Sequence, residues 1–284
     1  MVRIGTVWDS TVEAVRGRAG LIAPVAALAV FLPSVVQAAV QSYILTPGAA
    51  PSVGTSLLVA LLSVGVMLLT LWGALAITAI TSHPDVTRAE AARRASARLL
   101  PLLGVTIVLT LALFLLALPL FVLFAAAGVD LAQLSTPGYQ PQIGGGAALG
   151  AALYMFLLLG FFLWLFARLM PLVPVVLHER LGLRAIGRAF RLTKGMALRL
   201  VGVLLLFGIV VLIAAGATQL VFGTVFALIL GTDNAAPALF LAAVAAAAVS
   251  TLLSVISYVF VARLYVMLTG RDLADVFEDA RPVT

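Results

Sequence analysis

Six long apolar stretches that contain no Asp, Glu, Lys or Arg dominate this chain of 284 residues. A helix of roughly 20 apolar residues crosses a hydrocarbon core about 30 Å thick, and each stretch is at least that long. Spanning strands of a barrel are about 10 residues long and alternate in polarity, which these stretches do not. The sequence therefore predicts an all-α fold with six transmembrane helices, over residues 19–45, 53–80, 99–127, 147–167, 200–230 and 234–262.

The composition agrees with an integral membrane protein. Hydrophobic residues make up 63% of the chain and charged residues 10%, whereas soluble domains are about half apolar and a quarter charged. We expect a single membrane domain over residues 1–284. The chain has no Cys, which excludes disulfides and thiolate metal sites. The six stretches contain no Asp, Glu, His, Lys or Arg, and this disfavours proton-coupled transport.

The basic residues alternate with the apolar stretches. All 17 Lys and Arg lie before the first stretch, between the second and third, between the fourth and fifth, or after the sixth. By the positive-inside rule, this pattern predicts that both termini are cytoplasmic. Nucleic-acid binding requires no such alternation, so we assign the net charge of +6 to topology. The bias toward Arg and Ala suggests a GC-rich bacterial genome and hence a bacterial inner (plasma) membrane.

One cytoplasmic segment has the pattern of an amphipathic helix. Arg184, Arg188 and Arg191 recur at i, i+4 and i+7, while apolar residues follow nearly the same period on another face. This spacing is typical of a helix that lies in the membrane interface. The three arginines are candidate ligands for anionic lipid headgroups; the alternative is that they only set the topology and snorkel to phosphates. We expect a separate helix over residues 183–194, because Gly195 interrupts the pattern before the fifth stretch.

Similar short segments precede the first, third and fifth stretches. They are residues 13–18, 90–95 and 184–189, each rich in Arg and Ala. Each would open a unit of one basic interfacial helix followed by a helical hairpin. The sequence thus suggests three repeated helix-hairpin units in one domain.

Seven residues in and around the amphipathic segment form a motif: Glu179, Ala185, Arg188, Phe190, Thr193, Lys194 and Gly195. It resembles a motif of the bacterial six-helix family named for the glycerophosphodiester phosphodiesterase membrane domain, and of related inner-membrane proteins. The resemblance implies a six-helix fold and placement in a membrane. It implies no activity, because catalysis in that family belongs to a fused soluble domain with its own His and Glu residues.

The sequence contains no recognisable catalytic constellation. His83 and the pair His178-Glu179 lie at the cytoplasmic ends of the second and fourth stretches, but they lack the spacing of a metal or general-base motif. We interpret them as polar residues at helix ends and expect no enzyme activity, no metal and no cofactor.

Three hypotheses for function remain after this reasoning. The leading one is a non-enzymatic inner-membrane protein that organises lipids or partner proteins through its basic interfacial helices. The main alternative is a permease or exporter of small or lipidic solutes, suggested by the prolines in and near the spans and by the polar residues of the first, fifth and sixth stretches. A lipid-modifying enzyme that uses the region of His178 and Glu179 is the third.

Overall fold

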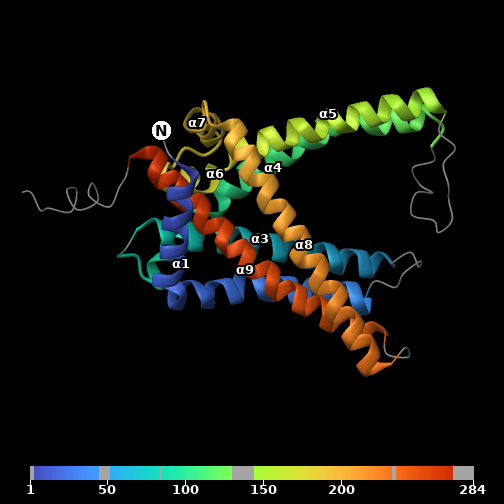
Figure 1. Cartoon of the computed structure of the whole chain (residues 1–284), viewed down its shortest axis with the longest axis horizontal. Coiled ribbons are helices and arrows are strands. Elements are labelled where there is room, and N and C mark those ends of the chain that lie inside the picture. The colour runs from blue at the N-terminus through green and yellow to red at the C-terminus, as the bar shows by residue number, and fades with distance from the viewer. Residues whose placement is uncertain (1–2, 45–51, 84, 130–143, 232–234, 271–284) are drawn as a thin grey trace, which may run out of the picture.

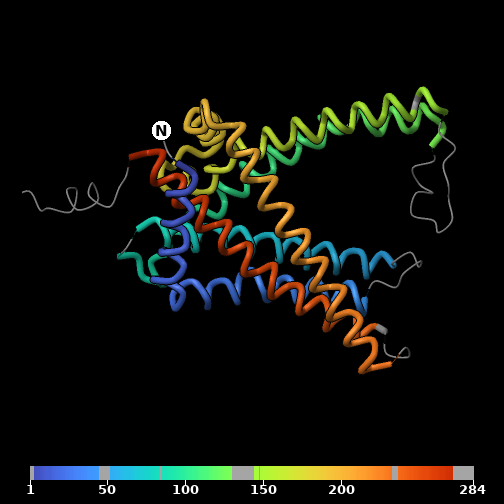
Figure 2. The backbone as a smooth tube through the Cα atoms, in the orientation of Figure 1, coloured from blue at the N-terminus to red at the C-terminus, as the bar shows by residue number. Residues whose placement is uncertain are grey.

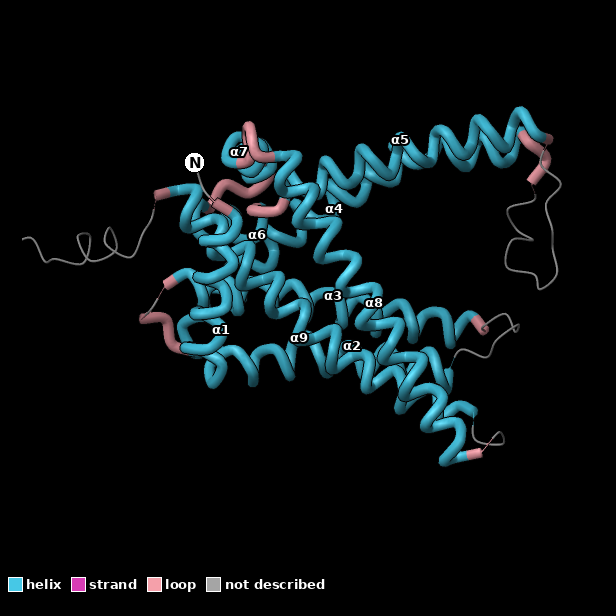
Figure 3. Tube along the Cα trace, in the orientation of Figure 1, coloured by secondary structure: helices cyan, strands magenta, loops and turns pink. Residues whose placement is uncertain are grey.

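The computed structural model of the chain describes residues 3–44, 52–83, 85–129, 144–231 and 235–270. Throughout these ranges the chain forms helices joined by short loops and turns, with no strand (Figure 3). Six continuous helical segments are long and apolar enough to cross a membrane, which confirms the predicted fold class. These segments are Ile4–Ile44, Val53–Ser82, Arg88–Ala126, Ala148–Glu179, Ala197–Leu230 and Ala236–Thr269.

The first span is not one regular helix. It bends at Arg18, whose backbone is non-helical with φ −128° and ψ 16°, so the preceding segment turns away from the span (Figure 1). Farther along, Pro33 has no N–H to donate to the carbonyl of Ala29. The chain widens there into a π-helical turn, which is a common cause of helix bending. The elements are α1 (Ile4–Ala26), η1 (Ala27–Phe31), α2 (Leu32–Ala39) and η2 (Val40–Ile44).

The second and third spans begin at side-chain caps. The hydroxyl of Ser52 accepts a hydrogen bond from the Thr55 amide at 3.1 Å and begins α3 (Val53–Ser82). The hydroxyl of Thr87 accepts one from the Glu90 amide at 3.3 Å and begins α4 (Arg88–Ala126). Such caps satisfy backbone donors that a helix start leaves free. The basic segment before the third span is therefore part of α4, not a separate interfacial helix as expected.

The second half of the chain contains the separate helix that the sequence predicts. The fourth span consists of α5 (Gly145–Leu169) and α6 (Leu172–Glu179), and α7 (Arg184–Leu192) follows it. Residues 193–196 form a turn in which Gly195 has a φ of 80°, a left-handed conformation that suits glycine. The fifth and sixth spans are α8 (Ala197–Leu230) and α9 (Ala235–Thr269). In Figure 1, α7 is seen end-on and lies across the spans.

The largest part of the core lies at one end of the bundle, which we call the basic end because the described Lys and Arg residues gather there. Both described ends of the chain, the turn after α3 and helix α7 lie at this end (Figure 1). Every residue of α3 from Gly73 to Ser82 is buried, whereas none from 53 to 72 is. Toward the other end the α4–α5 hairpin diverges from the remaining spans (Figure 2). The core thus fixes the helices where the polar side chains meet.

Candidate functional site

Helix α7 is docked at the basic end by one face. Ala185 and Ala189, one turn apart, are fully buried, and their small side chains allow close approach to the bundle. Arg184 and Arg191 are exposed on the opposite side. The Nε of Arg188 donates a hydrogen bond to a carboxylate oxygen of Glu179 at 2.8 Å. The three predicted lipid ligands therefore separate into two exposed arginines and one that is ion-paired.

Glu179 joins three helices through its two carboxylate oxygens. One oxygen accepts the Arg188 hydrogen bond, and the other accepts a hydrogen bond from the hydroxyl of Tyr265 in α9 at 3.1 Å. The Glu179 side chain is 15% exposed and Tyr265 is buried. A carboxylate removed from water is tolerated when its oxygens are hydrogen-bonded and its charge is paired. Glu179, at the end of α6, thus fastens both α7 and α9.

Thr193 and Phe190 of the resembling motif also have packing roles. The Thr193 hydroxyl approaches the backbone carbonyl oxygens of Ala189 at 2.8 Å, Arg168 at 3.1 Å and Phe190 at 3.4 Å. The Phe190 ring lies 5.8 Å from the Trp164 ring, and the Arg168 guanidinium lies over Phe190 at 5.1 Å. These contacts attach α7 to the end of α5. Lys194 and Gly195 are exposed in the turn that follows.

His83, which follows α3, and His178, in the last turn of α6, lie side by side, a contact that the sequence did not predict. The ring centroids of His83 and His178 lie 5.1 Å apart in an edge-to-face arrangement. His178 also stacks on Tyr265, with ring centroids 5.6 Å apart. In the part of the chain that the structure describes, no group of three or more His, Cys, Asp or Glu residues could hold a metal ion. The rings of His83, His178 and Tyr265 therefore form an aromatic cluster.

Arg18, at the bend of α1, caps the end of α3. Its Nη1 donates hydrogen bonds to the backbone carbonyl oxygens of Ile80 and His83. Cationic groups at this position satisfy the carbonyls that a helix end leaves free and interact favourably with the helix dipole. The bend therefore places a positive charge against the second span.

A small polar pocket lies beside Arg18, between the first part of α1 and the end of α9. Its volume is about 250 Å³. Ser10, Glu13 and Arg18 line it from α1, and Arg263 and Met267 line it from α9. Arg263 was not among the predicted site residues, because nothing in its sequence context distinguishes it from the other arginines near span ends.

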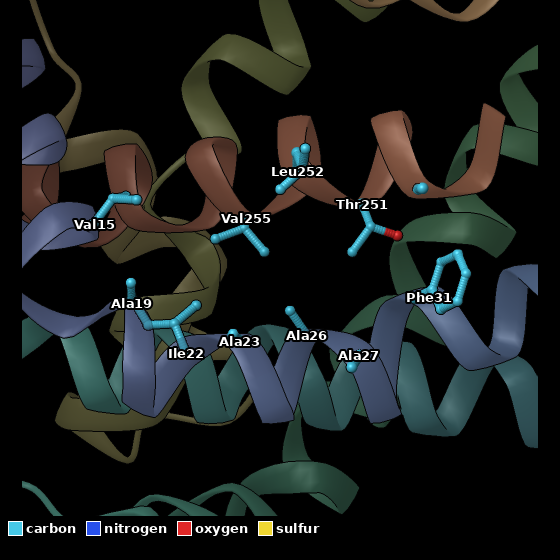
Figure 4. Close-up of a pocket in the computed structure, with 11 residues that line it drawn as sticks. Val15, Ala19, Ile22, Ala23, Ala26, Ala27, Phe31, Thr251, Leu252 and Val255 are labelled. Carbon is cyan, nitrogen blue, oxygen red and sulfur yellow. The ribbon is translucent and has the colours of Figure 1, made fainter. Parts of the chain in front are cut away.

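A larger apolar groove runs between α1, η1 and α9 (Figure 4). Its volume is about 410 Å³, and its walls include Ile22, Ala26, Phe31 and Val255. The hydroxyl of Thr251, which also lines the groove, donates a hydrogen bond to the backbone carbonyl of Ala247 at 2.7 Å. Such a surface suits hydrocarbon and offers no group for orienting a polar solute.

The fold and these sites define an α-helical, multi-pass membrane protein. No protein-family model, no curated protein and no solved structure matches the chain. The resemblance to the six-helix family therefore stays a prediction that is based on residues from Glu179 to Gly195.

Proposed function

We propose that this protein is a non-enzymatic protein of a bacterial inner membrane that gathers anionic lipid headgroups at its basic end, with both termini in the cytoplasm. The observation that carries the proposal is the exposure of Arg184 and Arg191 on a helix whose opposite face is buried. The gathering of basic residues at one end supports the orientation, since such residues favour the cytoplasmic side.

The attachment of α7 favours lipid binding over a purely topological role. A topology determinant needs only charge, whereas α7 is held across the spans by the ion pair between Arg188 and Glu179 and by its buried alanines. This attachment fixes the height of Arg184 and Arg191 relative to the spans. Two ligands that are positioned in advance lose less conformational freedom when a headgroup binds.

The expected affinity follows from the two exposed charges. Each Lys or Arg near an anionic membrane surface contributes about 1 kcal/mol. Arg184 and Arg191 together should contribute about 2 kcal/mol, or roughly 30-fold in affinity, before salt screening. Arg188 should contribute less, because Glu179 already neutralises its charge.

The double variant Arg184→Gln/Arg191→Gln tests this proposal. Native mass spectrometry in mild detergent would measure the retention of phosphatidylglycerol and cardiolipin. We expect retention to fall in this variant, because its two headgroup ligands are gone. The matched control is Arg93→Gln/Arg98→Gln, which removes the same charge from α4 at the same end and should retain lipid as the wild type does.

Two results would contradict the proposal that α7 binds anionic lipid. Unchanged lipid occupancy in a correctly inserted Arg184→Gln/Arg191→Gln variant would show that these arginines are topology determinants only. An equal loss in the α4 control would show that net charge alone, and not the placement of α7, retains the lipid.

A further inference from the structure

Arg263 is an arginine whose charge is not balanced by a close partner in the described structure. It lies in the last two turns of α9, and its Nε is buried without a hydrogen-bond partner among the described residues. No carboxylate of the described chain forms an ion pair with it. A guanidinium presents five N–H donors and does not lose its proton in proteins. A buried charged donor without an acceptor is costly, so the Nε of Arg263 favours a ligand that can accept its hydrogen bond, and an anion does this best.

The pocket around Arg263 carries a positive excess. The charged groups that act on Arg263 are Arg18 and Glu13, both from α1. Arg18 already uses its Nη1 for the two carbonyls at the end of α3. Asp85, which does not line the pocket, also acts on Arg18. Among the residues that line the pocket, two guanidinium groups face one carboxylate, that of Glu13. The pocket volume of about 250 Å³ is several times the roughly 30 Å³ that one water molecule occupies, so a tetrahedral anion has room.

We propose that this pocket binds the phosphate group of an anionic phospholipid, with Arg263 as the main donor and Arg18 as the second positive charge. The planar guanidinium matches phosphate oxygens in a two-pronged hydrogen-bonding geometry. A lipid fits better than a free anion because Val266 and Met267 add apolar wall to the pocket, and because both bordering helices continue into membrane spans. None of the lining residues belongs to α7, so the site is separate from the one proposed above.

The test uses the full chain in detergent and follows unfolding by tryptophan fluorescence during lipid titration. Phosphatidylglycerol should stabilise the wild type, whereas phosphatidylcholine should do so less. Arg263→Gln should weaken the apparent affinity for phosphatidylglycerol about fivefold, the effect expected for one basic residue near a headgroup. Arg263→Lys should lie between the two, because lysine keeps the charge and loses the planar fork.

Glu13→Gln is the variant that separates anion binding from a general loss of stability. It removes the acidic residue that lines the pocket, so it should strengthen the apparent affinity for phosphatidylglycerol. It also keeps the test decisive if Arg263→Gln does not fold. The matched control is Arg93→Gln in α4, which should leave the titration unchanged.

Three results would overturn the proposal. One is an unchanged affinity in a folded Arg263→Gln variant, and another is an affinity in Glu13→Gln that is unchanged or weaker. The third is stabilisation of the wild type by inorganic phosphate as strong as that by phosphatidylglycerol, which would identify a soluble phosphoanion as the ligand. The Arg184→Gln/Arg191→Gln variant should keep the Arg263-dependent part of the titration, so a failure of the α7 proposal is distinguishable from a failure of this one.

Discussion

Gly73 marks a point of close backbone approach between α3 and the π-helical turn η1. A Cβ atom at this position would lie 2.6 Å from the Cβ of Ala29, which is itself fully buried. Gly73→Ala should therefore destabilise the protein by about 1–3 kcal/mol, the usual cost of overpacking a core. The loss should appear although alanine is the better helix former by about 1 kcal/mol. Thermal unfolding in detergent measures it.

Gly65→Ala in the same helix is the control for Gly73→Ala. No atom lies within 4 Å of a Cβ built at Gly65, so only helix propensity acts there. This variant should be as stable as the wild type or slightly more stable. Equal destabilisation by both substitutions would contradict the close-approach argument.

Neither Gly73 nor Arg263 could be identified from sequence, and the reason is the same for both. The chain contains 24 glycines and many arginines near span ends, and each of these two residues acquires its role from a helix distant in the sequence. For Gly73 the partner is Ala29 in η1, and for Arg263 it is the pocket wall formed by α1. The local sequence pattern around a residue does not show which distant helix will pack against it.

At the scale of elements, the attachment of α7 depends on Glu179. Glu179→Gln removes the charge that pairs with Arg188, and hydrogen bonds to charged groups contribute about 1.5–3 kcal/mol. The part-exposed ion pair places the expected loss at the lower end of that range. Amide hydrogen exchange over residues 184–192 should accelerate, because α7 would open more readily. Tyr265→Phe removes the other hydrogen bond to the Glu179 carboxylate but leaves the ion pair with Arg188 in place, so it should accelerate the exchange of α7 less than Glu179→Gln does.

Glu90→Gln is the matched control for this measurement. Glu90 also forms an ion pair with an arginine, Arg94, at 2.8 Å, but both residues belong to α4. Its loss should leave the exchange of α7 unchanged. If Glu179→Gln leaves that exchange unchanged as well, then the buried alanines alone hold α7.

The sequence predicts the elements well where a strong local signal exists. The six spans follow from apolar length, and the break after α7 follows from Gly195, which has a positive φ. The expected break before the third span is absent because the Thr87 cap and the pair between Glu90 and Arg94 support one continuous helix. The π-helical turns were not predicted, since a proline indicates a disturbance but not the local geometry that relieves it.

At the scale of the whole molecule, polar contacts gather where the bundle is tightest. His83, after α3, and His178, in α6, lie far apart in the sequence, yet the core from Gly73 to Ser82 brings them together. The same packing places Arg18 against α3 and Tyr265 against Glu179. A sequence reveals which helix ends are polar, but the order of helices around the bundle decides which of those ends meet.

The arrangement of the whole chain in the membrane gives a final prediction. Reporter fusions after residues 50, 138 and 233 should read periplasmic, and fusions after 90, 185 and 284 should read cytoplasmic. Positions 50, 138, 233 and 284 lie outside the described residues. Six spans return the chain to the side on which it began, and the described ends of α1 and α9 lie together at the basic end (Figure 1).

One inverted reading would contradict this arrangement, because every later span would then change direction. It would also move α7 or the Arg263 pocket away from the cytoplasmic leaflet. Anionic headgroups give that leaflet its negative surface potential, which falls off within a Debye length, about 8 Å at physiological salt. Both lipid proposals therefore require the cytoplasmic orientation of the basic end, and the fusion measurements test that requirement independently of any lipid titration.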